Sequence, residues 1–133
     1  MINRLTAFLR RSDGSATVET VLWFPLFIAV FGLMLDVAMV FHGQAKVLRV
    51  AQEGNREFSI GRLADEAATK AYIEAELAAL NIQATATTTE IAGVAHTLVT
   101  VPANQLQVLG YFTAFSSLQL NITADHMIEY WEG

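Results

Sequence analysis

The sequence predicts an α+β protein in which a long N-terminal transmembrane helix continues into a small periplasmic domain. That domain is expected to hold a second helix and a short antiparallel sheet of about three strands. Residues 21–35 form an uncharged apolar run, and residues 65–80 are rich in strong helix formers. Later segments either are rich in Thr and Val or alternate apolar with polar residues, as strands do.

The composition fits a membrane-anchored chain better than an average soluble one. Hydrophobic residues make up 53% of the 133 residues and charged residues 16%, against ~25% charged in an average soluble protein. There are no cysteines, which excludes disulfides, thiolate metal sites and a cysteine nucleophile. The net charge of −5 falls on residues 42–133. We expect no nucleic-acid binding, because phosphate contacts need clustered Lys and Arg.

The apolar segment is long enough to cross a bilayer. The 26 residues from Ala16 to Phe41 are interrupted only by Glu19 and Asp36. A helix of this length spans roughly 39 Å, and the hydrocarbon core of a bilayer is ~30 Å thick. The sequence therefore predicts one membrane span, in contact with the lipid of a bacterial inner membrane.

The flanking charges orient this span. Three arginines precede it, whereas Lys46 and Arg49 follow it, so the positive-inside bias places the N-terminus in the cytoplasm. We expect residues 1–14 as a cytoplasmic leader, residues 15–41 as the transmembrane helix and residues 42–133 as a periplasmic pilin-like α+β domain. A secretory signal cleaved before Lys46 is an alternative, although such signals have apolar cores of only ~7–15 residues.

A glycine and a glutamate stand at the entrance of the apolar segment. The chain reads Gly14-Ser15-Ala16-Thr17-Val18-Glu19 directly after a basic leader, so the carboxylate follows the glycine by five residues. A carboxylate at the edge of a bilayer is costly unless it has a cationic partner. It is also tolerated at headgroup depth, near the positive end of the helix dipole. The residues alone leave both interpretations of Glu19 open.

Four residues inside the apolar run bear on how the helix packs. Pro25 removes a helical hydrogen bond and is expected to kink or loosen its turn, which membrane helices tolerate. Ala29 and Gly32 are small and would permit close approach of a neighbouring helix. Asp36 is expected at the outer interface of the membrane, with a functional intramembrane charge as the alternative.

The glycine-to-glutamate segment and the apolar run that follows it resemble the TadE-like family. Members of that family are minor pilins or pseudopilins of the tight-adherence (Tad) pilus system. The resemblance covers residues 12–60 well and the remainder loosely. Residues 118–127 look like the closing strand of the family, with Glu129 or Glu132 after it. The positions that carry the resemblance lie in the membrane segment: Gly14, Ala16, Glu19, Pro25, Gly32, Asp36 and Phe41.

The resemblance implies a processing and assembly site. A prepilin peptidase would cut after Gly14, and Glu19 would pair with the new amino group on Ser15 of a neighbouring subunit. The chain would be a non-catalytic TadE-like minor pilin or pseudopilin taking part in assembly of a Tad (Flp-type) adhesive pilus. Its partners would be other pilins or pseudopilins and the Tad secretion platform. The alternative is an uncleaved single-pass assembly factor or periplasmic binding module of the envelope.

The remaining elements follow from local patterns. The first helix is expected to continue past the membrane and to end at Gly54 or Gly61. Helical spacing is followed after the membrane by Phe41, Ala45, Leu48, Ala51 and Gln52. Residues 65–80 form a second helix.

A hairpin and a third strand are expected after the second helix. Residues 82–90 and 94–101 read as two strands joined at Ala92-Gly93, and residues 118–125 alternate clearly between apolar and polar side chains.

No catalytic constellation is evident. His42, His96 and His126 share no metal-ligand spacing, and a surface metal site of His126 with Asp125 and Glu129 is only a minor alternative. We therefore expect no enzyme activity, no cofactor, no metal and no small-molecule substrate.

Two aromatic clusters complete the sequence features. Tyr111, Phe112 and Phe115 form one, and Tyr130-Trp131 forms the other. Both are expected in core packing or interfacial anchoring, with a subunit contact as the alternative.

Overall fold

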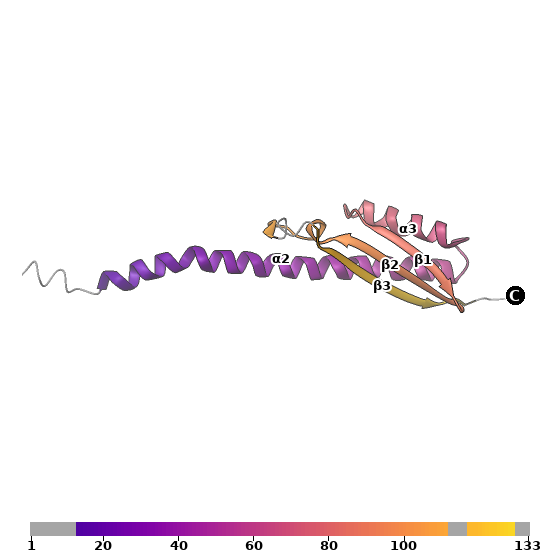
Figure 1. Cartoon of the computed structure of the whole chain (residues 1–133), viewed down its shortest axis with the longest axis horizontal. Coiled ribbons are helices and arrows are strands. Elements are labelled where there is room, and N and C mark those ends of the chain that lie inside the picture. The colour runs from indigo at the N-terminus through magenta and orange to yellow at the C-terminus, as the bar shows by residue number, and fades with distance from the viewer. Residues whose placement is uncertain (1–12, 112–116, 130–133) are drawn as a thin grey trace, which may run out of the picture. The chain divides into compact units, whose positions relative to one another are not determined.

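The computed structural model describes residues 13–111 and 117–129, with side chains from residue 16 onward. These residues form two α-helices, one short 3-10 helix and a three-stranded sheet (Figure 1). The predicted α+β class, with a long apolar N-terminal helix, a second helix and an antiparallel sheet, is confirmed. The chain divides into two compact units, one up to Met34 and one from Leu35 onward.

The first helix, α2, runs from Asp13–Ser59 without a break and contains Pro25. It ends shortly before Gly61, whose φ of +76° is a conformation that glycine adopts without strain. The prediction of an end at Gly61 is therefore right, and that of an end at Gly54 is wrong. A Cβ at Gly54 would lie 2.5 Å from Ile73 Cγ1, so this glycine serves close packing inside the helix.

The side of α2 that is buried in the second unit carries many small residues. Phe41 is 64% exposed, whereas Leu48 packs partly against the core. Small residues let other elements approach the helix closely. From Gly43 on, the buried positions follow one side of the helix, and Asp36 lies two turns before Gly43 on the same side. The buried residues of α2 in this unit are Asp36, Gly43, Val47, Ala51, Gly54, Asn55 and Ser59.

The second helix, α3, spans Glu66–Ala79 within the predicted range. Asp65 is its N-cap, and the Asp65 carboxylate accepts a 2.7 Å hydrogen bond from the N–H of Ala68. Ile73 and Leu77 are fully buried. They anchor α3 to the core at the helical spacing of four residues.

The sheet has the order β1-β2-β3 and is antiparallel throughout, with strands β1 (Thr85–Ile91), β2 (Val94–Pro102) and β3 (Gln119–Met127). Ala92 and Gly93 join the first two strands with φ values of 53° and 78°. Two positive φ angles in a two-residue connection are the signature of a type I′ turn, which matches the twist of a hairpin. The short 3-10 helix η1 (Ala103–Gln105) opens the connection from β2 to β3.

One face of the sheet packs on both helices and forms the core. Alternate residues of β2, from Ala95 to Val101, are buried, whereas their neighbours are at least partly exposed. Burying each large aliphatic side chain stabilises the fold by roughly 1.5–3 kcal/mol. The cluster draws on α2, α3 and all three strands: Val47, Ala51, Ile73, Leu77, Ile82, Ala86, Val99, Val101, Leu106 and Ala124.

A buried polar network joins α2 to the centre of the sheet. Asn55 Nδ2 donates to the carbonyl oxygen of Ala124 at 2.8 Å, and Asn55 Oδ1 accepts from Thr97 Oγ1. The hydroxyls of Thr97 and Thr88 are 2.8 Å apart and share a further hydrogen bond. Because buried polar groups need partners, this network specifies which turn of α2 faces which strand.

Helix α3 also covers the outer edge of β1. The N–H of Ala86 donates to Glu74 Oε1 at 2.9 Å, and the N–H of Glu90 donates to Glu66 Oε1 at 2.6 Å. Two carboxylates therefore occupy backbone donors that would otherwise be open to a strand from another chain.

Candidate functional site

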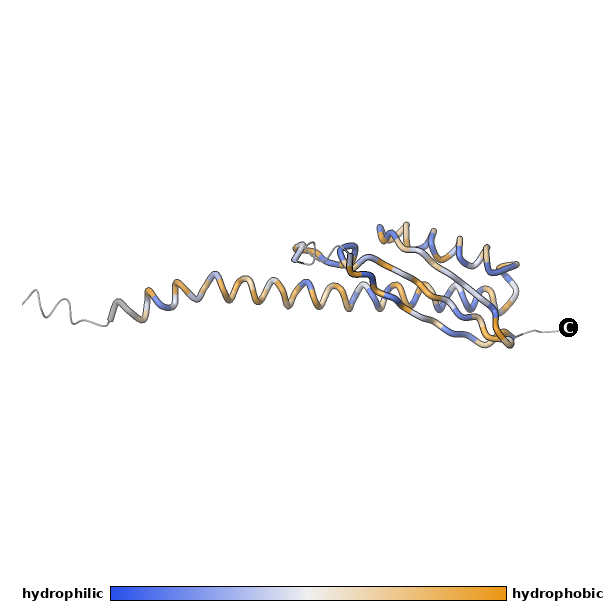
Figure 2. Tube along the Cα trace, in the orientation of Figure 1, coloured by the Kyte–Doolittle hydropathy of each residue, from blue (hydrophilic) through white to orange (hydrophobic). Residues whose placement is uncertain are grey.

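The first part of α2 exposes an apolar surface on all sides. The apolar stretch of this helix is almost entirely exposed within the described structure. Figure 2 shows the run of hydrophobic residues along this part of α2. By length and composition the helix could span a membrane. Its exposed apolar residues are Val18, Val21, Leu22, Trp23, Phe24, Leu26, Phe27, Ile28, Val30, Phe31, Leu33 and Met34.

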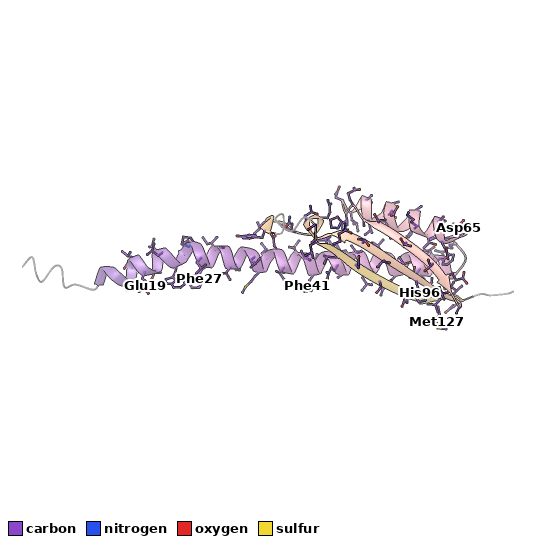
Figure 3. All side chains as sticks on the ribbon, in the orientation of Figure 1. Glu19, Phe27, Phe41, Asp65, His96 and Met127 are labelled. Carbon is purple, nitrogen blue, oxygen red and sulfur yellow. The ribbon has the colours of Figure 1, made fainter. Side chains whose placement is uncertain are left out.

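Glu19 lies near the start of this surface. Its side chain is exposed, and Figure 3 places it on α2 before Phe27. The neighbouring Thr20 hydroxyl donates to the carbonyl oxygen of Ala16 at 2.8 Å and so is satisfied within the helix. The carboxylate of Glu19 is therefore an exposed charged group on this apolar surface.

The other predicted site residues fall along the same helix. The backbones of Gly14 and Ser15 are helical, their side chains are not among those described, and most of the predicted leader lies outside the described residues. Pro25 and Ala29 are exposed and Gly32 is buried. The predicted loosening at Pro25, cleavage at Gly14 and helix packing through Ala29 and Gly32 stay predictions.

Asp36 lies in the second unit and is completely buried. Its Oδ1 atom accepts hydrogen bonds from the backbone N–H groups of Val108 at 3.0 Å and Leu109 at 2.6 Å. Its Oδ2 atom accepts from the N–H of Tyr111 at 2.8 Å. Asp36 and residues 108–111 are called the Asp36 clamp below.

The clamp depends on the local shape of the loop. Gly110 has a φ of +89°, which lets the chain turn so that nearby N–H groups converge on one anion. Such convergence gives a buried carboxylate the hydrogen bonds that it needs. The sequence shows Asp36 as an isolated charge in an apolar helix. It does not show which groups bond Asp36, because the donors are backbone N–H groups, which every residue except proline has.

The outside of the clamp is apolar. Val108 is 60% exposed, Leu109 53% and Tyr111 41%. Three hydrogen bonds join these residues to Asp36 of α2. Phe112 and Phe115 of the predicted aromatic cluster, and Tyr130-Trp131, lie outside the described residues.

The opposite end of the second unit carries charged groups. Asp125 Oδ1 lies 2.8 Å from His96 Nδ1 on the exposed face of the sheet, and Figure 3 places His96 near Met127 at this end. A depression of about 700 Å³ nearby is lined in part by Asp65, Glu66 and Glu90. Asp65 and Glu66 already bond backbone N–H groups, so these carboxylates serve the fold.

The metal site considered for His126 has no support in the structure. Asp125 pairs with His96 instead, and successive residues of a strand such as Asp125 and His126 face opposite sides of the sheet. Across residues 13–111 and 117–129, no group of three or more His, Cys, Asp or Glu side chains is arranged to hold a metal ion.

Comparison with known proteins bears on the long helix. A family model described as "TadE: TadE-like protein" matches residues 14–56, a segment that begins at Gly14 and includes Glu19, Pro25 and Asp36. No curated protein and no solved structure matches the chain. The resemblance to the TadE-like family is therefore confirmed over residues 14–56, which make up most of α2.

Proposed function

We propose that this protein is a TadE-like minor pilin or pseudopilin that takes part in assembling a Tad (Flp-type) adhesive pilus and has no catalytic role. The observation that carries the proposal is a single helix with an apolar exposed surface and an exposed Glu19 at its start, inside the matched segment. Such a surface is stable in lipid or against other apolar helices.

The proposed assembly contact follows from the charge of Glu19. In the membrane an isolated carboxylate is costly, and a cation from another subunit would offset that cost. Cleavage after Gly14 would create a positively charged amino group on Ser15, near the N-terminus of the helix. Pairing of this group with Glu19 of a neighbour would define how far one subunit is displaced along the next.

In this proposal residues 1–14 are a cytoplasmic leader, residues 15–41 cross the inner membrane and residues 42–133 lie in the periplasm. The prepilin peptidase, other pilins and the Tad secretion platform are the proposed partners. The continuity of α2 through Lys46 argues against a cleaved secretory signal. Cleavage there would remove Asp36 and Gly43, both buried within the second unit.

The first test is the intact mass and N-terminal sequence of the protein from native membranes, with and without the prepilin peptidase. We expect a chain that begins at Ser15 and disappears when the peptidase is absent or when Gly14 is replaced by Val. A chain that keeps residues 1–14 in both strains would support the uncleaved membrane-anchored factor instead. A chain that begins at Lys46 would mean that the apolar segment is only a secretion signal.

The second test separates processing from assembly. We expect Glu19→Gln to be processed and inserted normally but to reduce the number of pili on the cell surface, because the neutral amide cannot form the charge pair. Glu53→Gln, at an exposed position later in α2, is the matched control and should leave pilus number unchanged. Equal pilus numbers in both variants would exclude the proposed role of Glu19.

A further inference from the structure

We propose that the Asp36 clamp enters the outer leaflet of the membrane and seats the domain on lipid, through a surface formed by Val108, Leu109 and Tyr111. This inference rests on the proposed membrane span of α2. It goes beyond that span because it assigns a second membrane contact, contributed by the connection between β2 and β3.

Helix length places Asp36 inside the bilayer boundary. Seventeen residues separate Glu19 from Asp36, which corresponds to roughly 26 Å of helix, less than the ~30 Å of a hydrocarbon core. The first Lys or Arg after Asp36 is Lys46. If Glu19 lies at the cytoplasmic interface, Asp36 and whatever is bonded to it lie at the depth of the outer acyl chains.

Hydrogen bonding makes this depth tolerable for both partners. Non-helical backbone at membrane depth is tolerated only where protein covers it and satisfies its polar groups, and a buried carboxylate requires donors. The clamp pairs the carboxylate with three N–H groups of the loop, since those of Val108, Leu109 and Tyr111 all donate to Asp36. Without the loop the carboxylate would face lipid, and without the carboxylate three N–H groups would face lipid.

The side chains around the clamp suit a lipid surface. Val108 and Leu109 are more than half exposed, and Tyr111 adds an aromatic ring with a polar tip, the type of residue found at membrane interfaces. No Asp, Glu, Lys or Arg occurs between Ile91 and Ala124. The connection therefore carries no charge that would have to be dehydrated.

The two ends of the second unit differ in polarity, as expected if only the clamp end contacts lipid. The clamp end is apolar, whereas Ser59 bonds Met127 at the other end, where His96 and Asp125 also lie. Exposed Ile91 belongs to that far end, next to the β1–β2 turn. It offers a control position of similar exposure, 62%, that should remain in water.

Depth-dependent fluorescence quenching tests the inference on the full chain. The chain has no native cysteine, so single substitutions Val108→Cys, Ile91→Cys and Phe27→Cys can each carry one environment-sensitive fluorophore. The labelled proteins are reconstituted into vesicles of phosphatidylethanolamine and phosphatidylglycerol. Quenching is compared between lipids that carry a nitroxide on the acyl chain and lipids without it.

We expect strong acyl-chain quenching at Phe27, clear quenching with blue-shifted emission at Val108, and neither effect at Ile91. Quenching at Phe27 but not at Val108 would overturn the inference and leave the membrane span standing. A blue shift at Val108 without quenching would also overturn it, because protein rather than lipid would then cover the clamp. Absence of quenching at Phe27 would instead contradict the membrane span itself.

Discussion

Asp36 and Leu109, which are 73 residues apart in the chain, are joined by a 2.6 Å hydrogen bond from the N–H of Leu109 to Asp36 Oδ1. This bond, with those from Val108 and Tyr111, ties the connection between β2 and β3 to the first helix. A charge within an apolar helix thus becomes an anchor for residues 108–111 of this connection.

Asp36→Ala should release this loop. The three N–H groups would lose their acceptor, and the amides of Val108, Leu109 and Tyr111 would exchange with solvent deuterium several-fold faster. The measurement is hydrogen exchange of the full chain in detergent micelles. Glu19→Ala is the control, since exposed Glu19 bonds no part of the loop. Unchanged exchange in Asp36→Ala would show that other contacts hold the loop.

Gly54→Ala should destabilise the second unit although alanine is the better helix former. A Cβ at Gly54 would lie 2.5 Å from Ile73 Cγ1 and 2.7 Å from Ile73 Cδ1. Overpacking of this kind costs roughly 1–3 kcal/mol, more than the ~1 kcal/mol gained in helix propensity. Thermal unfolding followed by circular dichroism should show a lower midpoint. Gln52→Ala, at an exposed position of the same helix, should not lower it.

Asn55→Ala should weaken the attachment of α2 to the sheet. It removes the donor to Ala124 and the acceptor of Thr97. Leaving buried polar groups without partners costs about 1–3 kcal/mol. In chemical denaturation, a double-mutant cycle with Thr97→Val should show that the two losses are not additive. Thr97→Ser keeps the hydroxyl and should cost less than Thr97→Val. Additive losses would mean that the two side chains act independently.

Removal of the carboxylates that cover β1 should promote self-association. In the double variant Glu66→Ala/Glu74→Ala, the N–H groups of Ala86 and Glu90 lose their acceptors, and the strand edge becomes available to another chain. Size-exclusion chromatography over a range of concentrations should show larger species. The pair Glu53→Ala/Glu76→Ala, at two exposed positions, changes net charge equally and serves as the control. Equal elution of both variants would contradict this role of α3.

Tyr72 should make stability fall at alkaline pH. Burial raises the pKa of its phenol above the ordinary value of 10, and the carboxylates of Glu76, Glu53 and Glu57 raise it further. The unfolded chain releases this proton near pH 10 while the folded chain keeps it. The stabilisation is therefore complete below pH 10 and is lost as pH rises above 10.

Tyr72→Phe removes this component because phenylalanine has no proton to lose. The variant should lose less stability than the parent between pH 9 and pH 11, as measured by urea denaturation at each pH. Parallel curves for the two proteins would show that Tyr72 does not titrate differently in the folded state.

Local patterns were enough to predict the secondary structure. The helix formers of residues 65–80 predicted α3, and Ala92-Gly93 between two Thr- and Val-rich segments predicted the hairpin. They were not enough to predict packing. Phe41 follows the helical spacing and is exposed, whereas small Gly43 lies on the buried side. Apolar residues outside a core are normal when lipid or another helix is their intended environment, so hydrophobicity alone does not identify the buried side of such a helix.

The sequence by itself determined the apolar helix, the α+β class and the TadE-like character of residues 14–56. Each of these follows from composition, periodicity or short-range spacing, which a chain carries before it folds. Only the tertiary structure decided what surrounds Asp36, why Gly54 must lack a side chain and which edge of the sheet is covered. These features depend on backbone groups and on contacts between residues far apart in the chain, which become defined when the helices and the sheet pack together.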